Sequence, residues 1–284
     1  MLQKIPFVKM QGAGNDYIYI DCFKTQIKNP ERLAIIMSPR RLSVGADGVI
    51  LICPSDKADA KMRIFNLDGS EGKMCGNGIR CVGKYLFESG IVRKNIITVE
   101  TLSGIKQLSL ECDGESVVSV TVEMGKAEFK AALVPVISDK AEMINEPLCV
   151  NGREYRITAV SMGNPHAVVF CDDVKGLNLE EIGPGFEQHR AFPESVNTEF
   201  IKVINETCLE MRVFERGSGE TFACGTGACG AVAAAVKNGL CPADREITVN
   251  LTGGKLFITY RSDGSVAMRG GAVKVYEGVF EYES

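Results

Sequence analysis

The chain has 284 residues, of which 45% are hydrophobic and 24% are charged, and its formal net charge is -4 at pH 7. This composition is that of a globular protein and argues against a disordered one. The acidic balance, without any basic run, argues against a nucleic-acid partner. No stretch resembles a signal peptide or a membrane span, so we expect a cytoplasmic protein of one large or two ordinary domains that has no membrane partner.

The first half of the sequence predicts strands around a single helix. An aromatic and β-branched run predicts a strand at residues 18–21, and another is expected at 61–65. Cys75 follows in the stretch FNLDGSEGKMCGNGIRC. A helix is expected directly after this cysteine and should end at Gly90, since glycine supplies the left-handed stop. Further strands follow, the first of them in ITVETLSG at residues 97–104.

The second half repeats this order at a fixed offset. Cys224 lies 149 residues after Cys75 (224 − 75 = 149), and Gly239 lies 149 after Gly90. ITVNLTGG, at residues 247–254, matches ITVETLSG with one extra residue. The helix expected after Cys224, ACGAVAAAVK, is apolar on nearly every face and should be buried. We therefore expect an α+β fold of two pseudo-symmetric domains, each a mixed or antiparallel sheet wrapped around a central helix.

The length of the repeat also predicts the domain boundaries. A period near 150 residues indicates two domains of similar fold and is far too long for a solenoid. We place the boundary near Gly125, which gives an N-terminal half of residues 1–125 and a C-terminal half of residues 126–270. The last predicted strand, at 272–282, has no counterpart at the end of the first copy. Residues 271–284 are therefore expected to complete the N-terminal half.

The eleven cysteines of the chain do not predict a metal site. Structural zinc sites favour close pairs such as C-x2-C, whereas the local spacings are x5 between Cys75 and Cys81 and x4 between Cys224 and Cys229. Only two histidines are present to supplement them. Most of the remaining cysteines are expected to be small buried hydrophobic residues.

The two repeated cysteines predict a particular chemistry. A cysteine just ahead of a helix faces unpaired N–H groups and the helix dipole, which should lower its pKa from about 8.5. The glycines after it let a carboxylate approach those N–H groups. If two such elements hold one substrate, a thiolate can remove the proton next to the carboxylate and the opposite thiol can return one. We expect a two-base racemase or epimerase, with the sulfurs roughly 7 Å apart.

Other interpretations compete with this one. A cysteine at a helix start is often only packing, although packing does not require its polar neighbours to repeat. Thiol redox enzymes usually place their pair close together, as in C-x-x-C. The run from Gly225 to Gly230 matches the nucleotide-binding pattern G-x-G-x-x-G, but it does not directly follow a strand, and Cys81 replaces the last glycine in the other copy.

Several motifs together resemble those of diaminopimelate epimerase. They are GAGNDY, VGADG, FNLDGSEGKMCGNGIRC, SMGNPH, FPESVNTEF and ERGSGETFACGTGAC. The resemblance covers nearly the whole chain. It implies a cofactor-independent isomerase that interconverts LL- and meso-diaminopimelate, a precursor of lysine and peptidoglycan. The related proline racemases and hydroxyproline epimerases typically have His in place of Asn77 and an Asp near the second cysteine, which this chain lacks.

The resemblance also implies the roles of individual residues. It makes Cys75 and Cys224 the acid/base pair. The reacting α-carboxylate would be held by Gly76, Asn77, Gly225 and Thr226. Two residues would lie near the reacting centre and orient the substrate amine or the thiols: His166 and Glu215, the latter also binding substrate. The distal amino-acid end would be held by Asn15, Asn66, Asn164, Asn197 and Arg216.

One position departs from part of the family. Gly48 stands where some members have Gln, so a side-chain contact to the substrate is expected to be lost in the first half. No metal and no cofactor are expected, and the resemblance implies a homodimer. Two alternatives stay open: a relative that acts on proline or hydroxyproline, and a non-catalytic protein that binds amino acids.

Overall fold

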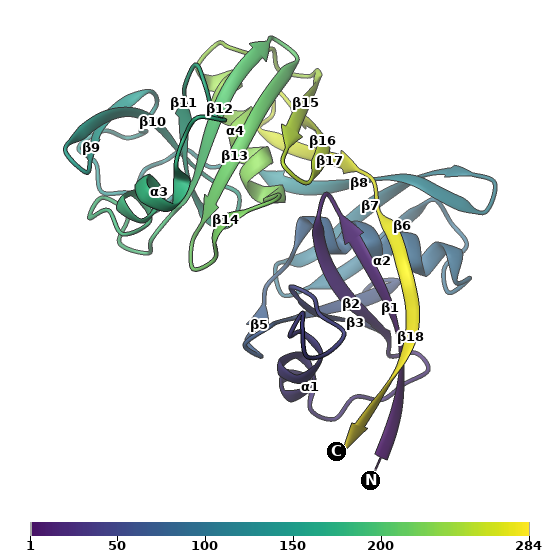
Figure 1. The fold of residues 1–284 in the computed structure, drawn as a ribbon. Helices are drawn as coiled ribbons and strands as arrows, with labels where there is room; N and C mark the ends of the chain where they lie inside the picture. The colour runs from purple at the N-terminus through teal and green to yellow at the C-terminus, as the bar shows by residue number, and fades with distance from the viewer. Residues whose placement is uncertain (1, 284) are drawn as a thin grey trace. The chain divides into compact units, whose positions relative to one another are not determined.

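The computed structural model describes residues 2–283, and the chain divides into two compact units (Figure 1). Unit 1 comprises Met1–Val122 together with Gly270–Ser284, and unit 2 comprises Glu123–Arg269. Each unit contains a mixed sheet, a central helix and one shorter helix. The predicted α+β class is therefore confirmed.

The sheet of unit 1 has the spatial order β18–β1–β2–β3–β4–β6–β7–β8. The pairs β2–β3 and β4–β6 are parallel and the others are antiparallel. The short β5 (Glu71–Gly72) pairs with β4 just before the central helix. The other strands are β1 (Leu2–Gly12), β2 (Asn15–Asp21), β3 (Gly48–Cys53), β4 (Ala60–Asn66), β6 (Ile96–Thr101), β7 (Gly104–Asp113), β8 (Ser116–Lys126) and β18 (Val273–Glu283).

The sheet of unit 2 has the same order and the same directions, β9–β10–β11–β12–β13–β15–β16–β17. The pairs β11–β12 and β13–β15 are again the parallel ones, and β14 (Gly219–Thr221) takes the place of β5. The other strands are β9 (Glu146–Val150), β10 (Arg153–Ser161), β11 (Pro165–Phe170), β12 (Asn197–Asn205), β13 (Cys208–Glu215), β15 (Glu246–Leu251), β16 (Gly254–Tyr260) and β17 (Ser265–Gly270).

The register of the strands follows the sequence repeat. In unit 1 Ile18 pairs with Val49, and the residues 149 positions later, Ala167 and Thr198, pair in unit 2. The extra residue found in the sequence also has a place. Ala60 pairs with Val99, whereas the equivalent of Ala60, Leu209 (60 + 149), pairs with a residue shifted by 150, Val249. The repeat is therefore a repeat of strand pairing.

A central helix follows each repeated cysteine, as predicted. The helix α2 (Gly76–Glu88) packs on β1, β2 and β7, and α4 (Gly225–Lys237) packs on β10, β11, β12 and β16. The alanine-rich α4 is buried along most of its length, which confirms that prediction. Gly90 and Gly239 both adopt positive φ (77° and 70°) just beyond these helices, so the predicted stops are confirmed.

A shorter helix covers a second apolar cluster in each unit. The helix α1 (Pro30–Met37) begins at Asn29, whose side chain accepts a hydrogen bond from the Arg32 N–H, and it buries Leu33 and Met37. In unit 2 the helix α3 (Leu179–Glu187) buries Phe186. Side chains alternate along a strand, so successive residues of β2 and β11 point either to the central helix or to the apolar cluster under the shorter helix. The residues that point to the central helix include polar ones, which therefore lie near the cysteine at its start.

Candidate active site

Cys75 and Cys224 are the N-cap residues of α2 and α4. Both have extended backbone angles, with φ of -128° and -113°. The sulfur of Cys75 accepts a hydrogen bond from the Gly78 N–H at 3.3 Å, and that of Cys224 accepts one from the Gly227 N–H at 3.4 Å. Each sulfur thus satisfies one of the N–H groups that a helix leaves unpaired at its start.

The four residues predicted to hold a carboxylate form the first turns of these helices. Gly76 and Asn77 open α2, and Gly225 and Thr226 open α4. First-turn N–H groups and the helix dipole favour an anion there. The Asn77 side chain is buried, and its Oδ1 accepts a hydrogen bond from the buried Arg80 at 2.9 Å. The contribution of Asn77 to a carboxylate site is therefore expected from its backbone.

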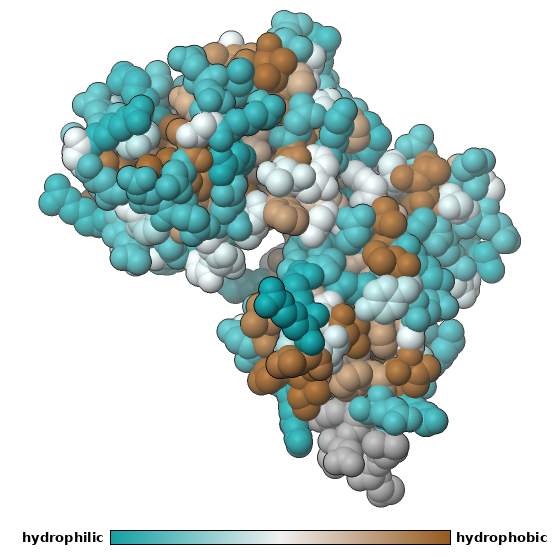
Figure 2. Space-filling model, viewed as in Figure 1, coloured by the Kyte–Doolittle hydropathy of each residue, from teal (hydrophilic) through white to brown (hydrophobic). Residues whose placement is uncertain are grey.

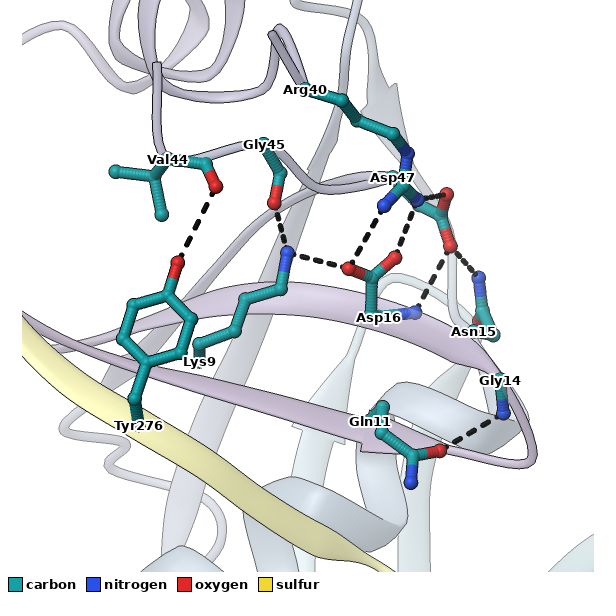
Figure 3. A network of polar contacts seen from close by, with 10 residues as sticks. All are labelled: Lys9, Gln11, Gly14, Asn15, Asp16, Arg40, Val44, Gly45, Asp47 and Tyr276. Carbon is teal, nitrogen blue, oxygen red and sulfur yellow. Dashed lines mark hydrogen bonds and ion pairs between the residues drawn. The ribbon is translucent and has the colours of Figure 1, made fainter.

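In unit 1, Asn15 lies beside Cys75. Its Oδ1 accepts the thiol proton at 3.1 Å, and its Nδ2 donates to Oδ2 of Asp47 at 2.5 Å. Asp47 also accepts from Arg40 at 2.7 Å (Figure 3). Arg40 and Lys9 both contact the neighbouring Asp16. Asn15 is thus held in one orientation by an ion-pair network behind it.

Asp16 anchors that network. The buried Lys9 lies 2.5 Å from one of its carboxylate oxygens, and Arg40 lies 2.6 Å from the other. Burial alone would raise the pKa of Asp16, but the hydrogen bonds and charges of Arg40 and Lys9 outweigh it, so the pKa lies below its ordinary value. Lys9 also donates to the backbone oxygen of Gly45, which fixes the loop that carries Asp47.

Asn66 and Gly48 lie opposite each other at the ends of β4 and β3. Nδ2 of Asn66 donates to Oγ of Ser70 at 3.0 Å. A Cβ atom added to Gly48 would lie 2.2 Å from the backbone oxygen of Phe65. The backbone is therefore built around glycine at position 48, and a longer residue there would require β3 and β4 to move apart.

In unit 2, His166 and Asn164 take the places of Tyr17 and Asn15 (166 − 149 = 17; 164 − 149 = 15). Nε2 of His166 lies 3.1 Å from Oδ1 of Asn164, and its Nδ1 lies 2.7 Å from Oε1 of Glu199. His166 and Glu199 are both fully buried. The asparagine oxygen that meets the thiol in unit 1 therefore meets a histidine in unit 2.

Glu215 and Cys224 form the other side of this half-site. Glu215 ends β13 and accepts a hydrogen bond from the Thr221 hydroxyl. Burial raises the pKa of Glu215, and the nearby charge of Glu199 adds to the effect. The sulfur of Cys224 lies 3.5 Å from the Thr226 hydroxyl.

The pKa expected for one of the two cysteines is wrong. Cys224 is 5% exposed, and burial raises its pKa well above the ordinary value, with the charges of Glu215 and Glu199 acting in the same direction. The hydrogen bonds from Thr226 and the Gly227 N–H act the other way but are weaker. Burial and two carboxylates therefore outweigh the start of the helix.

Asn197 and Arg216 contact each other through the backbone. The Arg216 N–H donates to Oδ1 of Asn197 at 3.0 Å, and Nδ2 of Asn197 donates to the Pro165 oxygen at 3.0 Å. The exposed Arg216 guanidinium donates to the Glu194 oxygen at 2.7 Å. Both polar ends of Asn197 thus have partners within the protein, so its position supports a structural role beside any contact with a substrate.

Three residues close to the cysteines were absent from the sequence prediction. The buried Tyr17 lies next to Cys75 and Asn15, and burial, together with the charges of Cys75 and Asp47, raises its pKa. Asp47 and Glu199 are the others. The repeat offset could have found Tyr17, because it stands in the position of His166. Glu199 lies within the motif FPESVNTEF, but the repeat does not mark it, because its counterpart is Ile50 (199 − 149 = 50).

Two other kinds of site do not occur in the described part of the chain. Among residues 2–283, no group of three or more His, Cys, Asp or Glu side chains is arranged to hold a metal ion. Within the same residues, no helix has the length and apolar character needed to cross a membrane.

Comparison with known sequences gives one family. The family model described as diaminopimelate epimerase matches residues 7–130 and 158–275. Diaminopimelate epimerase from Acetivibrio thermocellus is 50% identical over 273 residues, covering 96% of this chain and 97% of the relative. The same enzyme from Bacillus cytotoxicus is 47% identical over 286 residues, covering 99% of each chain.

Comparison with solved structures gives the fold. A hydroxyproline epimerase from Agrobacterium vitis, solved with trans-4-hydroxy-L-proline, has a TM-score of 0.74 at 16% identity. The superposition covers 99% of this chain and 93% of that structure. A Bacillus anthracis phenazine biosynthesis protein of the PhzF family has a TM-score of 0.72 at 18% identity, with 99% of this chain covering 100% of it. At such low identity these two structures show a shared fold and nothing about the substrate.

Proposed function

The chain belongs to the diaminopimelate epimerase family, and we propose that it interconverts LL- and meso-diaminopimelate by moving the α-proton between two thiols, those of Cys75 and Cys224. It is an isomerase whose substrate is a small molecule. The observation that carries the two-thiol mechanism is the repeated placement of the cysteines. Each is the N-cap of the central helix of its unit, with its sulfur on the first-turn N–H groups.

The chemistry follows from that placement. A thiolate takes the α-proton and becomes a thiol, while the electron pair of the broken C–H bond passes into the carboxylate. First-turn N–H groups at Gly76 and Asn77, and at Gly225 and Thr226, stabilise the negative charge that develops on the carboxylate oxygens. The opposite thiol then gives its proton to the other face of the carbon and becomes a thiolate. The configuration inverts, and the protein keeps the same number of protons.

The polar residues around the cysteines divide between the two ends of the substrate. Glu215 is close to Cys224, and its carboxylate suits the α-ammonium group. His166, in the same half-site as Cys224, orients Asn164 through the contact of its Nε2 with Oδ1 of Asn164. The exposed Arg216 guanidinium suits the distal carboxylate, and the amides of Asn15, Asn66, Asn164 and Asn197 can both donate and accept around the distal end.

We also propose that the enzyme works in the cytoplasm as a homodimer. Three valines of β18 remain substantially exposed in the single chain, Val273 at 49%, Val275 at 53% and Val279 at 59%. Figure 2 shows hydrophobic residues at the surface where Figure 1 draws β18. Burial of this apolar strand by a second copy would remove it from water. Sedimentation equilibrium of the wild-type chain and of Val279→Glu measures this, and a wild-type monomer at micromolar concentration would refute it.

Proton NMR in D2O tests the function. The reduced protein is incubated with LL-diaminopimelate and, in parallel, with L-proline and with trans-4-hydroxy-L-proline. We expect the α-proton signal of diaminopimelate to disappear as the meso isomer forms. Exchange of proline or hydroxyproline alone would keep the two-thiol chemistry and overturn the substrate. Exchange with none of the three would leave a protein that only binds amino acids.

A further inference from the structure

Glu199, in β12, is a buried acid to which neither the sequence motifs nor the proposed mechanism gives a role. Its side chain is fully buried, and Oε1 lies 2.7 Å from Nδ1 of His166. The other oxygen, Oε2, has no hydrogen-bond partner among the described residues. A buried carboxylate with one unsatisfied oxygen is costly, which suggests that it does something other than stabilise the fold.

The carboxylate lies against the first turn of α4. A Cβ atom added to Gly227 would be 2.4 Å from Oε1 of Glu199, so only glycine lets the acid come this close to the helix. The N–H of the same Gly227 donates to the sulfur of Cys224 at 3.4 Å. The acid and the thiol therefore share one turn of backbone, and a negative charge on either one disfavours a negative charge on the other.

Unit 1 has no acid in this place. The counterpart of Glu199 is Ile50, and a Cβ atom added to Gly78 would be 2.6 Å from its Cδ1. The first turn of α2 therefore packs on hydrocarbon where that of α4 packs on a carboxylate. The two half-sites share their strand pairing and differ in charge.

The other charged and titratable groups around Cys224 come from the two strands that pair with β12. Glu215 faces the cysteine from β13, and His166, on β11, lies beside Glu199. A negative charge on the sulfur of Cys224 therefore meets two carboxylates, those of Glu215 and Glu199.

We propose that Glu199 is a positioning residue that holds Cys224 as the thiol in the free enzyme. This rests on the proposed function, in which Cys224 must give a proton to the α-carbon of one isomer. A turnover in that direction leaves Cys224 as the thiolate, and the charge of Glu199 favours the return of a proton to it.

The test measures each thiol separately and needs no substrate. Wild type, Glu199→Gln and Glu199→Asp are alkylated with iodoacetamide over a pH series, and mass spectrometry follows the peptides that contain Cys75 and Cys224. Glu210→Gln serves as the matched control, because Glu210 is an acid of the neighbouring β13 whose partner is Lys175 on the surface. Midpoints are compared rather than rates, since the two sulfurs differ in exposure.

In the wild type we expect the midpoint of Cys224 to lie above the ordinary thiol value of about 8.5. Glu199→Gln should move the Cys224 midpoint to lower pH, raise its alkylation rate near neutral pH several-fold and leave Cys75 in place. Glu199→Asp keeps the charge and should stay close to wild type, as should Glu210→Gln. A Cys224 midpoint unchanged in Glu199→Gln, or a shift shared equally by both cysteines, overturns the proposal.

Two further outcomes are also decisive, one for a variant that does not fold and one that separates this proposal from the proposed function. If Glu199→Gln does not fold, as judged by circular dichroism, the wild type alone decides, because a Cys224 midpoint at or below about 8.5 contradicts the proposal. If Glu199→Gln shifts the Cys224 midpoint as expected and yet the wild type leaves diaminopimelate unchanged in the NMR experiment, then the proposed function fails while the effect of Glu199 on its thiol stands.

Discussion

The thiol of Cys75 donates to Oδ1 of Asn15 at 3.1 Å, and the amide of Asn15 is in turn held by Asp47. The same position in unit 2, Asn164, gives its oxygen to His166. One amide in each half-site thus fixes a different partner. In unit 1 it fixes the direction of a thiol proton, so we expect Asn15 to act on the chemistry through Cys75 as well as through any contact with the substrate.

Replacing Asn15 by alanine should lower kcat/KM. The change leaves Cys75 without its acceptor and leaves Oδ2 of Asp47 with one donor fewer. Loss of about 1–2 kcal/mol from such contacts corresponds to a decrease of roughly tenfold. Asn178→Ala is the control, because Asn178 precedes α3 without a capping hydrogen bond. The assay is diaminopimelate epimerisation at several substrate concentrations, and a value within about twofold of wild type would contradict the role of Asn15.

Removal of either repeated cysteine should abolish epimerisation. Cys75→Ala and Cys224→Ala each leave only one proton-carrying group, so we expect rates to fall by at least about 100-fold. Cys149→Ala removes an exposed thiol and should have no effect. Loss of optical activity, or NMR of the diastereomers, measures the rate. If either active-site variant retained wild-type turnover, the two-base scheme would be wrong.

The glycines of the two first turns should respond differently to alanine. In Gly227→Ala the new methyl group meets a carboxylate oxygen held by His166, so we expect the free energy of unfolding to fall by about 1–3 kcal/mol. In Gly78→Ala it meets the flexible end of Ile50, and the higher helix propensity of alanine offsets part of the cost. The loss should be smaller.

Urea denaturation measures both effects, and Gly271→Ala provides the reference. A Cβ atom at Gly271 has no atom within 4 Å, and its backbone lies outside the left-handed region. Equal losses in Gly78→Ala and Gly227→Ala would show that the carboxylate moves aside as easily as an isoleucine methyl group.

Asp16 should make the stability of the protein depend on acid. Its folded pKa lies below the ordinary value because Arg40 and Lys9 outweigh burial. A lowered folded pKa means that the stabilisation is present above the unfolded pKa and is lost as the pH falls through the folded one. We therefore expect the urea midpoint of the wild type to decrease from about pH 5 toward about pH 2.

Asp16→Asn should reduce that decrease, because the titrating group is gone, at the cost of lower stability near neutral pH. Asp56→Asn, at an exposed position, should follow the wild-type curve. The hypothesis fails if Asp16→Asn keeps the full acid dependence of the wild type.

Much of the fold could be predicted because the sequence repeat corresponds to a repeat of strand pairing. The offset of 149 residues, and its increase to 150 after the central helix, reappear in the pairs Ala60–Val99 and Leu209–Val249. Strand and helix positions followed from the hydrophobic pattern, with ends that differ by a few residues. For example, the strand expected at 18–21 begins at Asn15. The structure gives the positions of the predicted site residues. Their roles remain predictions.

The pKa of Cys224 could not be predicted from its motif. A helix start favours the thiolate, and this reasoning uses only the residues next to the cysteine. The larger effects come from burial, from Glu215 and from Glu199, which lies 25 residues earlier in the chain (224 − 199 = 25) on another strand. The partners of Asn197 are likewise visible only once β11 and β12 are paired. Electrostatics at a site depends on which strands pack beside it.

One edge strand of each sheet comes from a different part of the chain in the two units. In unit 2 the edge strand beside β10 is β9, which precedes β10 in the chain. In unit 1 the equivalent strand beside β1 is β18, which is synthesised after all the other strands. Unit 2 is one uninterrupted run, while unit 1 needs residues from both sides of it. On the ribosome, the half that is synthesised second can therefore complete its sheet first. The earlier half must wait, with the edge of β1 uncovered, until residues beyond 270 emerge, a reversal of the usual N-terminal-first order.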